Sequence, residues 1–336
     1  CRELDLDINM SSILSDLKEE IREGASQDYV ASRGEYLNAI ILSYYLDFEF
    51  IDAAKLIVFD KKGRFDSEAT QAKVQSELAK VSRAIIPGFY GAMPDGQIKT
   101  FSRGGSDITG AIIARGVDAK LYENWTDVSG FLMADPRIVK NPRPIETITY
   151  KELRELSYMG APVLHEETIF PVKKAGIPIS IKNTNAPEDL GTVIVDDMSP
   201  VNYSDIITGI AGKKDFTVIA IEKTFMSSEK GFFRKLMSIM ETNDITVEHM
   251  PSSIDSISLI VSNSDLNSKL DKVIEEIRIY CSPDSIVCYP DMALIAVVGR
   301  GMIKTKGVSA KVFTALANED VNIRMITQGS SELNII

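Results

Sequence analysis

The sequence predicts an α/β protein in two parts: a layered domain with a largely parallel sheet, followed by two smaller α+β units. Up to about residue 195, short apolar strand patterns alternate with helical periodicity, which is typical of helices packed on a parallel sheet. After residue 205 the pattern changes to a strand–helix–strand–strand unit that occurs twice. We therefore expect a boundary in the polar, turn-rich segment 196–205, with domains at 1–200 and 201–336.

The elements of the first part follow from the spacing of its apolar residues. Helical periodicity, at i, i+3, i+4 and i+7, predicts helices over residues 11–46, 67–81, 107–115 and 150–175. Short apolar runs between them predict strands at 55–59, 84–86, 120–122, 178–182 and 192–195.

The second part contains an internal repeat with an offset of 76 residues and no gap. Lys230-Gly231, a helix and Asp244 correspond to Lys306-Gly307, a helix and Asp320. An apolar strand precedes each copy, at 217–221 and 293–298. Incidental similarity is the alternative, but an ungapped match of this length favours duplication. We place the two units at about 215–281 and 285–336.

Composition excludes several classes of protein. Hydrophobic residues make up 44% and charged residues 25%, which is ordinary for a folded chain with a core. The net charge of −11 argues against nucleic acid as a partner, and no apolar run approaches the ~20 residues that span a bilayer. Cys1, Cys281 and Cys288 form no disulfide or metal-ligand pattern, so we expect a reduced, cytoplasmic protein.

The first residues have neither an initiator Met nor a signal-peptide core. Their pattern is typical of the middle of a helix, and we expect further sequence upstream of Cys1.

The segment Arg103-Gly104-Gly105-Ser106-Asp107 precedes an apolar helix. Two glycines at a helix start let backbone N–H groups approach an anion, and Arg103 adds a planar cation suited to a carboxylate or phosphate. Ser106 or Asp107 capping an ordinary turn is the alternative. Alone, the loop predicts only that an anion binds at a helix start.

Further motifs follow in a fixed order along the chain. They are Ser-Arg-Gly-Glu at 32–35, which we expect to open a helix, Trp-Thr-Asp-Val at 125–128, Asp-Pro-Arg at 135–137, Gly-Ala-Pro-Val-Leu-His-Glu at 160–166, and Asn-Thr at 183–184 with Gly-Thr at 191–192. In this order and spacing they resemble the aspartokinases of the amino-acid kinase family, from about residue 28 to 336. The duplicated units resemble ACT domains, which belong to the same family pattern.

The resemblance implies an amino-acid-kinase-type three-layer αβα sandwich followed by two ferredoxin-like ACT units. It implies transfer of the ATP γ-phosphate to the side-chain carboxylate of L-aspartate, the first step of lysine, threonine and methionine biosynthesis, with Mg²⁺ bridging ATP oxygens. Positioning and charge neutralisation dominate such a transfer. The carboxylate is already a nucleophile near neutral pH, so no general base is needed.

Under the resemblance, Glu35 accepts the substrate ammonium group, although it could instead be a first-turn carboxylate favoured by the helix dipole. Arg103 clamps the substrate α-carboxylate, with Gly104, Gly105 and Ser106 lining the same pocket. Asp107 organises the catalytic lysine and the polar network around the phosphates. The residues implied at the nucleotide are Thr126, Asp127, Leu132, Arg137, Pro162 and Val163.

Three departures from the family pattern stand out. The Lys-x-Gly-Gly-x-Ser loop with the catalytic lysine is absent, so this chain as given should be inactive or nearly so, with the lysine upstream of Cys1. Pro162 occupies the place of a lysine near ATP, and Leu132 that of an aromatic residue near the adenine.

The ACT resemblance also implies an amino-acid effector and a dimer, or a dimer of dimers, through the ACT-like units. The acidic side chain of Glu248 could bind an ammonium group of the effector, which favours lysine over threonine. Glu248 could instead be an exposed strand residue. The implied effector residues are Met226, Thr246, Val247, Glu248 and Ser253.

Two rival functions stay open at this point. One is a kinase of the same family that acts on another small acid; the Ser-Arg-Gly-Glu motif and the paired units argue against it. The other is a non-catalytic protein that binds an amino acid, which the missing lysine loop favours if the chain is complete. An upstream Lys-x-Gly-Gly-x-Ser strand would exclude the second.

Overall fold

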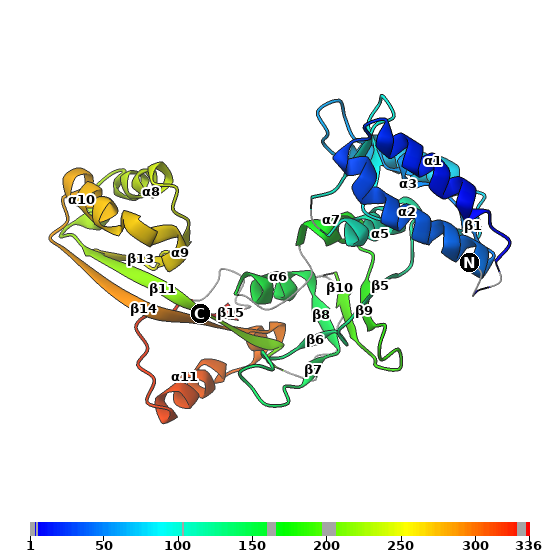
Figure 1. The fold of residues 1–336 in the computed structure, drawn as a ribbon. Coiled ribbons are helices and arrows are strands. Elements are labelled where there is room, and N and C mark those ends of the chain that lie inside the picture. Colours follow the sequence, from blue (N-terminus) through cyan, green and yellow to red (C-terminus); the bar gives the residue numbers. More distant parts are fainter. Residues whose placement is uncertain (1–3, 5, 103, 160–165, 197–205, 328–333) are drawn as a thin grey trace. The chain divides into compact units, whose positions relative to one another are not determined.

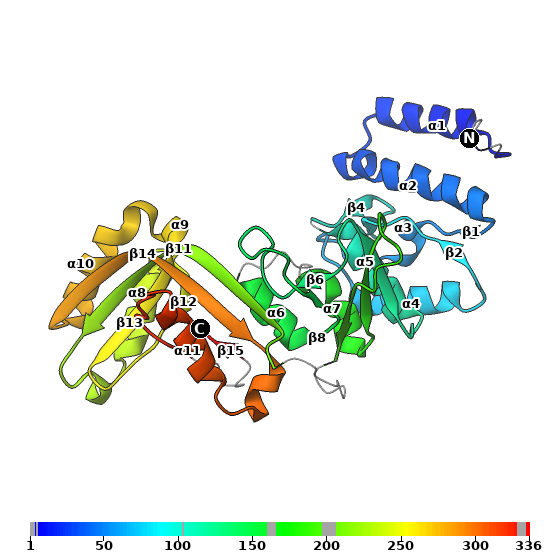
Figure 2. The ribbon, with the colours of Figure 1, turned by 90° about the horizontal axis from the view of Figure 1, so that it is seen from below.

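The computed structural model describes residues 4, 6–102, 104–159, 166–196, 206–327 and 334–336, and its ribbon is drawn in Figures 1 and 2. The chain divides into two compact units. The first comprises Cys1–Phe131, Pro144–Tyr150 and Val163–Val201, and the second Leu132–Arg143, Lys151–Pro162 and Asn202–Ile336. Short segments before residue 202 therefore belong to the second unit, and the domain limits 1–200 and 201–336 stay a prediction.

The helices of the first unit begin at polar caps. Ser26 accepts a hydrogen bond from the Tyr29 N–H at 3.1 Å at the start of α2, and Asp66 caps α4 in the same way. Helices α5 and α7 lie side by side (Figures 1 and 2). The helices are α1 (Met10–Arg22), α2 (Gln27–Leu46), α3 (Ala53–Leu56), α4 (Ser67–Leu78), α5 (Gly105–Gly116) and α7 (Glu166–Ala175).

The main sheet of the first unit has four strands in the order β5-β9-β10-β8. The β5–β9 and β10–β8 pairs are parallel and the β9–β10 pair is antiparallel, so the α/β class with parallel pairing is confirmed. These strands are β5 (Tyr122–Thr126), β8 (Thr147–Thr149), β9 (Ile179–Asn183) and β10 (Thr192–Val195). Shorter pairs are formed by β1 (Glu49–Phe50) with β2 (Ala84–Ile85), β3 (Tyr90–Ala92) with β4 (Ile98–Thr100), and β6 (Phe131–Leu132) with β7 (Pro144–Ile145).

Four sequence predictions of local structure are wrong. Of the strand expected at 55–59, Lys55 and Leu56 instead end α3, because the Asp52 carboxylate accepts the Ala54 N–H at 3.0 Å and starts a helix, while residues 58 and 59 form only isolated β-bridges. The strand expected at 120–122 begins only at Tyr122 and runs to Thr126. The Ser-Arg-Gly-Glu motif at 32–35 lies inside α2 rather than opening it, because Ser26 caps the helix earlier. The strand expected directly after the helix in the second copy of the strand–helix–strand–strand unit does not form, and residues 321–327 have no regular secondary structure.

The second unit is built on a five-stranded antiparallel sheet in the order β12-β13-β11-β14-β15. Its strands are β11 (Gly209–Glu222), β12 (Val247–His249), β13 (Ser256–Ser262), β14 (Ser285–Val298) and β15 (Asn334–Ile335). Its helices are α6 (Tyr150–Tyr158), η1 (Met226–Ser228), α8 (Phe232–Thr242), α9 (Asn263–Leu266), η2 (Asn267–Lys269), α10 (Leu270–Cys281), η3 (Arg300–Lys304) and α11 (Val308–Asn318). No described helix is long and apolar enough to cross a membrane.

The 76-residue repeat is visible in the backbone of this unit. Strand β14 starts and ends 76 residues after β11, and α11 does the same relative to α8. The long strands pair antiparallel from Gly209 opposite Val298 to Glu222 opposite Ser285, so a local two-fold axis relates the copies. Gly231 and Gly307 adopt φ values of +81° and +83° at matching positions before the two helices. We call residues 209–281 the first repeat and 285–336 the second repeat.

Candidate functional site

The start of α5 has the backbone that the glycines predict. Gly104 is the N-cap residue in a left-handed conformation, with φ +53°, and no described side chain caps the helix. Gly105 is buried, and a Cβ there would lie 2.5 Å from Cδ2 of Phe89. A simple capped turn is therefore not what forms, and the first N–H groups of α5 stay open to a ligand. Arg103 lies outside the described residues.

A contact that sequence reasoning missed supports this loop. Phe89 has a φ of +81°, which is strained for a bulky residue, and it packs on Gly105. Its N–H donates to the Thr109 hydroxyl at 3.1 Å, which donates to the Gly105 carbonyl at 2.7 Å. The only signal in the sequence was the turn dipeptide Pro87-Gly88.

Asp107, in the first turn of α5, is oriented from strand β5. The buried Asn124 amide donates to the Asp107 carboxylate at 2.9 Å, and the Tyr122 hydroxyl donates to the Asp107 backbone carbonyl at 3.1 Å. Burial raises the pKa of Tyr122 to about 12, so its hydroxyl stays a donor at neutral pH. Strand β5 thus holds both the side chain and the backbone carbonyl of Asp107, whereas the neighbouring Ser106 is exposed.

Thr126 and Asp127 lie where β5 ends, at the edge it shares with the parallel strand β9. The Thr126 carbonyl accepts hydrogen bonds from the Thr184 N–H and hydroxyl at 2.8 and 2.9 Å. The Thr126 hydroxyl donates to the Asp127 carboxylate at 3.2 Å, and Asp127 is exposed. The structure therefore brings two predicted motifs, 125–128 and 183–184, together at the carboxyl ends of parallel strands, where ligands of α/β folds bind.

Glu35 is exposed in the middle of α2 and has no ion-pair or hydrogen-bond partner among the described residues. Its neighbour Arg33 is buried and stacks on the rings of Tyr29 and Tyr36 at 4.2 and 4.5 Å. Asp28, near the start of α2, binds Lys99 at 2.8 Å on β4, which leads into the Arg103–Asp107 loop. These contacts tie α2 to the strand before that loop, but Glu35 makes no hydrogen bond or ion pair with the described residues of the loop.

Leu132 and Arg137, which are also predicted to contact the nucleotide, belong to the second compact unit. Leu132 is exposed in β6. Arg137 forms a fork with Asp135, with its Nη2 atom 2.6 Å from Oδ2 and its Nε 3.0 Å from Oδ1. Hydrogen bonds from Arg137 lower the pKa of Asp135, so the pair is ionised at neutral pH. Pro162 and Val163 lie outside the described residues.

The predicted effector residues fall into two groups in the first repeat. Met226 is buried in η1, and the Ser227 N–H donates to Ile254 O at 3.2 Å, which places η1 beside the turn that holds Ser253. Exposed Thr246 donates its N–H to Asp265 at 3.2 Å, and Val247 pairs with Val261.

Glu248 forms the second group. It lies 3.8 Å from the Lys213 ammonium, and its hydrogen bond with Tyr158 adds to burial in raising the pKa of that phenol. A contact between Glu248 and Met226 or Ser253 is not formed within the described part of the chain.

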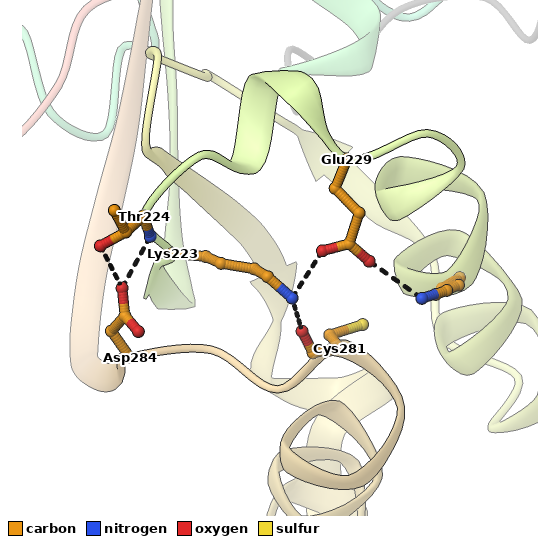
Figure 3. Close-up of polar contacts among 6 residues, drawn as sticks. Lys223, Thr224, Glu229, Cys281 and Asp284 are labelled. Atoms are coloured by element: carbon orange, nitrogen blue, oxygen red, sulfur yellow. Dashed lines mark hydrogen bonds and ion pairs between the residues drawn. The ribbon is translucent and has the colours of Figure 1, made fainter.

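An ion cluster lies at the start of α8 in the first repeat (Figure 3). The Lys223 ammonium is 2.6 Å from Oε2 of Glu229 and also donates to the carbonyl of Cys281, the last residue of α10. The other carboxylate oxygen of Glu229 is 2.9 Å from the Lys235 ammonium. Hydrogen bonds from Lys223 and Lys235 lower the pKa of Glu229. No local pattern in the sequence predicts this cluster.

The chain matches two family models: the amino acid kinase family over residues 3–183 and an ACT domain over residues 295–336. It is 38% identical to aspartokinase 3 of Bacillus subtilis over 318 residues, which cover 92% of this chain and 70% of that protein. The similarity therefore extends across both compact units.

Solved structures give the same result. The aspartate kinase of Clostridium acetobutylicum is 60% identical, with a TM-score of 0.91 over 99% of this chain and 77% of that chain. Aspartokinase III of E. coli in complex with lysine and aspartate is 26% identical, with a TM-score of 0.68 over 92% of this chain and 70% of that chain. Its complex with aspartate and ADP is 25% identical, with a TM-score of 0.68 over 98% and 78%.

Proposed function

The chain belongs to the aspartokinases of the amino acid kinase family and is an aspartate kinase, and we propose that it binds L-aspartate at the start of α5, facing ATP. The product is 4-phospho-L-aspartate. The observation that carries this proposal is the open helix start at Gly104 and Gly105, with Asp107 oriented by Asn124. An open helix start binds anions, and Asp107 is held within reach of the edge where β5 ends.

Each predicted residue has a chemical task in this proposal. Arg103 and the N–H groups of Gly105 and Ser106 hold the substrate α-carboxylate, and Glu35 accepts its ammonium group. Asp107 orients the cation that neutralises the transferring phosphoryl group. Thr126 and Asp127 hold the nucleotide, with Leu132, Arg137, Pro162 and Val163 completing its contacts. Mg²⁺ bound to ATP oxygens would supply further charge neutralisation.

Arg137 can bind a phosphate of the nucleotide under one condition. Its guanidinium is already engaged by Asp135, so it contacts a phosphate only by sharing or exchanging that partner. The exposed side of the guanidinium leaves donors for such sharing.

The test traps the acyl phosphate of the full-length encoded protein with hydroxylamine, using ATP, Mg²⁺ and L-aspartate. We expect aspartyl hydroxamate, and we expect Asp107→Asn to lower kcat by about a hundredfold. Asp118→Asn, at the opposite end of α5, is the matched control and should leave kcat unchanged. Arg103→Ala should raise the KM for aspartate by about tenfold or more. Hydroxamate from another acid but none from aspartate would overturn the substrate.

We also propose that lysine, rather than threonine, inhibits the enzyme through Met226, Thr246, Val247, Glu248 and Ser253. The half-buried carboxylate of Glu248 suits an ammonium group, and the E. coli relative was solved with lysine. Glu248→Gln should raise the lysine concentration for half-inhibition by about tenfold, and Glu241→Gln, on the exposed surface of α8, should not. Inhibition by threonine alone would contradict the assignment.

The assembly is part of the same proposal. Pairing of two ACT regions gives a dimer or a dimer of dimers in the cytoplasm, with regulatory units at 215–281 and 285–336. Sedimentation equilibrium of the full-length protein tests this, and a monomer at micromolar concentration would exclude it.

A further inference from the structure

We propose that the second repeat holds a binding site for a small aliphatic carboxylate, in a pocket beside the start of α11. The pocket has a volume of about 570 Å³, a size typical of small-molecule sites. All of its lining residues belong to the second compact unit. None of the described residues predicted for aspartate, the nucleotide or the amino-acid effector lines it, so the inference goes beyond the proposed function.

The first repeat shows what chemistry the corresponding position accepts. There, the Glu229 carboxylate sits just before α8 and binds the Lys235 ammonium at 2.9 Å (Figure 3). Glu229 therefore acts as an internal carboxylate ligand at a helix start. In the second repeat, 76 residues later, Thr305 replaces Glu229 and Lys311 replaces Lys235.

The backbones at the two positions match closely enough to transfer this argument. The Lys235 N–H donates to the Gly231 carbonyl at 3.0 Å, and the Lys311 N–H donates to the Gly307 carbonyl at 3.1 Å. The two glycines have nearly the same φ, so each lysine leaves its helix at the same turn. Lys311 has the position of the carboxylate-binding Lys235, but Thr305 stands where Glu229 supplies the carboxylate.

Lys311 has no ion-pair partner among the described residues. The Thr305 hydroxyl donates to the Gly301 carbonyl at 2.7 Å, so it is committed to its own backbone. Lys306 and Arg143 line the same pocket and add further positive charge. The 11-residue helix α11 contributes the positive end of its dipole, because no described side chain caps it and its first turn has no acidic residue.

The rest of the pocket selects the body of the ligand. Part of its wall is aliphatic, and three of these aliphatic side chains stay more than a third exposed: Val139, Ile206 and Ile210. Covering these groups with an apolar ligand removes them from water. Among the described residues no acidic side chain lines the pocket, so an ammonium group there would lose its hydration without gaining a countercharge from them. The ligand class is therefore a monocarboxylate with a short branched aliphatic chain and no amino group.

The experiment is calorimetric titration of the full-length protein with 4-methyl-2-oxopentanoate and with 4-methylpentanoate. These two probes distinguish an oxo acid from a short fatty acid as the source of the carboxylate. L-Leucine and 4-methyl-1-pentanol, which keep the aliphatic body, test the requirement for a carboxylate without an ammonium group. We expect at least one carboxylate to bind, and both comparison compounds to bind about tenfold or more weakly.

Three variants locate the site. Lys311→Ala should weaken binding by about tenfold or more, and Thr305→Glu should do the same by restoring the internal carboxylate of the first repeat. Lys304→Ala, at an exposed neighbouring lysine that does not line the pocket, should change the affinity less than about twofold. Circular dichroism confirms that each variant is folded.

Absence of binding by both carboxylates, equal binding of L-leucine, or unchanged affinity in both pocket variants would overturn the proposal. Kinase activity is not read out, so this test is independent of the proposed function.

Discussion

The two repeats share a backbone but differ in what lies against their matching helices. In the first, α8 and α10 cover the sheet and enclose fifteen buried core residues. In the second, the corresponding cluster of described residues has four buried members beside α11. Before α8 in the first repeat, Glu229 forms ion pairs with Lys223 and Lys235. At the matching position before α11, the second repeat has Thr305. Duplication has thus preserved the turn geometry while the interior and the charges changed independently.

The largest expected difference between the repeats concerns their cores. Leu236 is fully buried, and its counterpart Val312 only partly. Leu236→Ala should cost about 2–5 kcal/mol of unfolding free energy, because it leaves a cavity among well-packed neighbours. Val312→Ala should cost about 1 kcal/mol or less, because it removes fewer and less buried methyl groups. Hydrogen exchange followed by mass spectrometry resolves the two repeats separately.

In that experiment, faster exchange confined to the first repeat in Leu236→Ala would sharpen the comparison. Equal losses from both substitutions would contradict it, because they would mean that the second repeat is packed as tightly as the first.

Sequence reasoning predicted the repeat well because the repeat rests on local signals. The Lys-Gly turns and the helices that follow them are set by residues within a few positions of each other. The same holds for the glycines at the start of α5.

What the sequence could not reveal depends on long-range contacts. Asn124 reaches Asp107, and Lys223 reaches Cys281 across 58 residues, and neither pairing has a periodic pattern. The start of α2 was misplaced because the Ser-Arg-Gly-Glu motif looks like a helix start, while the cap is Ser26. The strain at Phe89 likewise arises from its packing on Gly105.

A smaller effect, and one expected to be equal in both repeats, concerns the glycines before α8 and α11. Gly231→Ala and Gly307→Ala should each cost about 1–2 kcal/mol, because an L-residue is strained at φ values of +81° and +83°. A Cβ at either position meets no atom within 4 Å, so crowding adds nothing. Gly34→Ala, inside α2 and also uncrowded, is the control and should stabilise the protein by about 0.5–1 kcal/mol. Chemical denaturation measures all three, and unequal costs in the two repeats would contradict their backbone equivalence.

The smallest expected effect tests the ion cluster through its pH dependence. Because hydrogen bonds from Lys223 and Lys235 lower the pKa of Glu229 in the folded state, folding favours the ionised carboxylate. This contribution is complete above the ordinary pKa of 4.5 and is lost as the pH falls through the lower, folded value.

Glu229→Gln should therefore reduce the melting temperature at pH 7, and the difference from the parent protein should shrink below pH 4.5. Glu241→Gln, exposed on α8, should show no such change. A difference for Glu229→Gln that is constant with pH would mean that packing, not charge, closes this helix start. Thr305→Glu should introduce the same dependence into the second repeat, because Lys311 supplies there the cation that Lys235 supplies in the first.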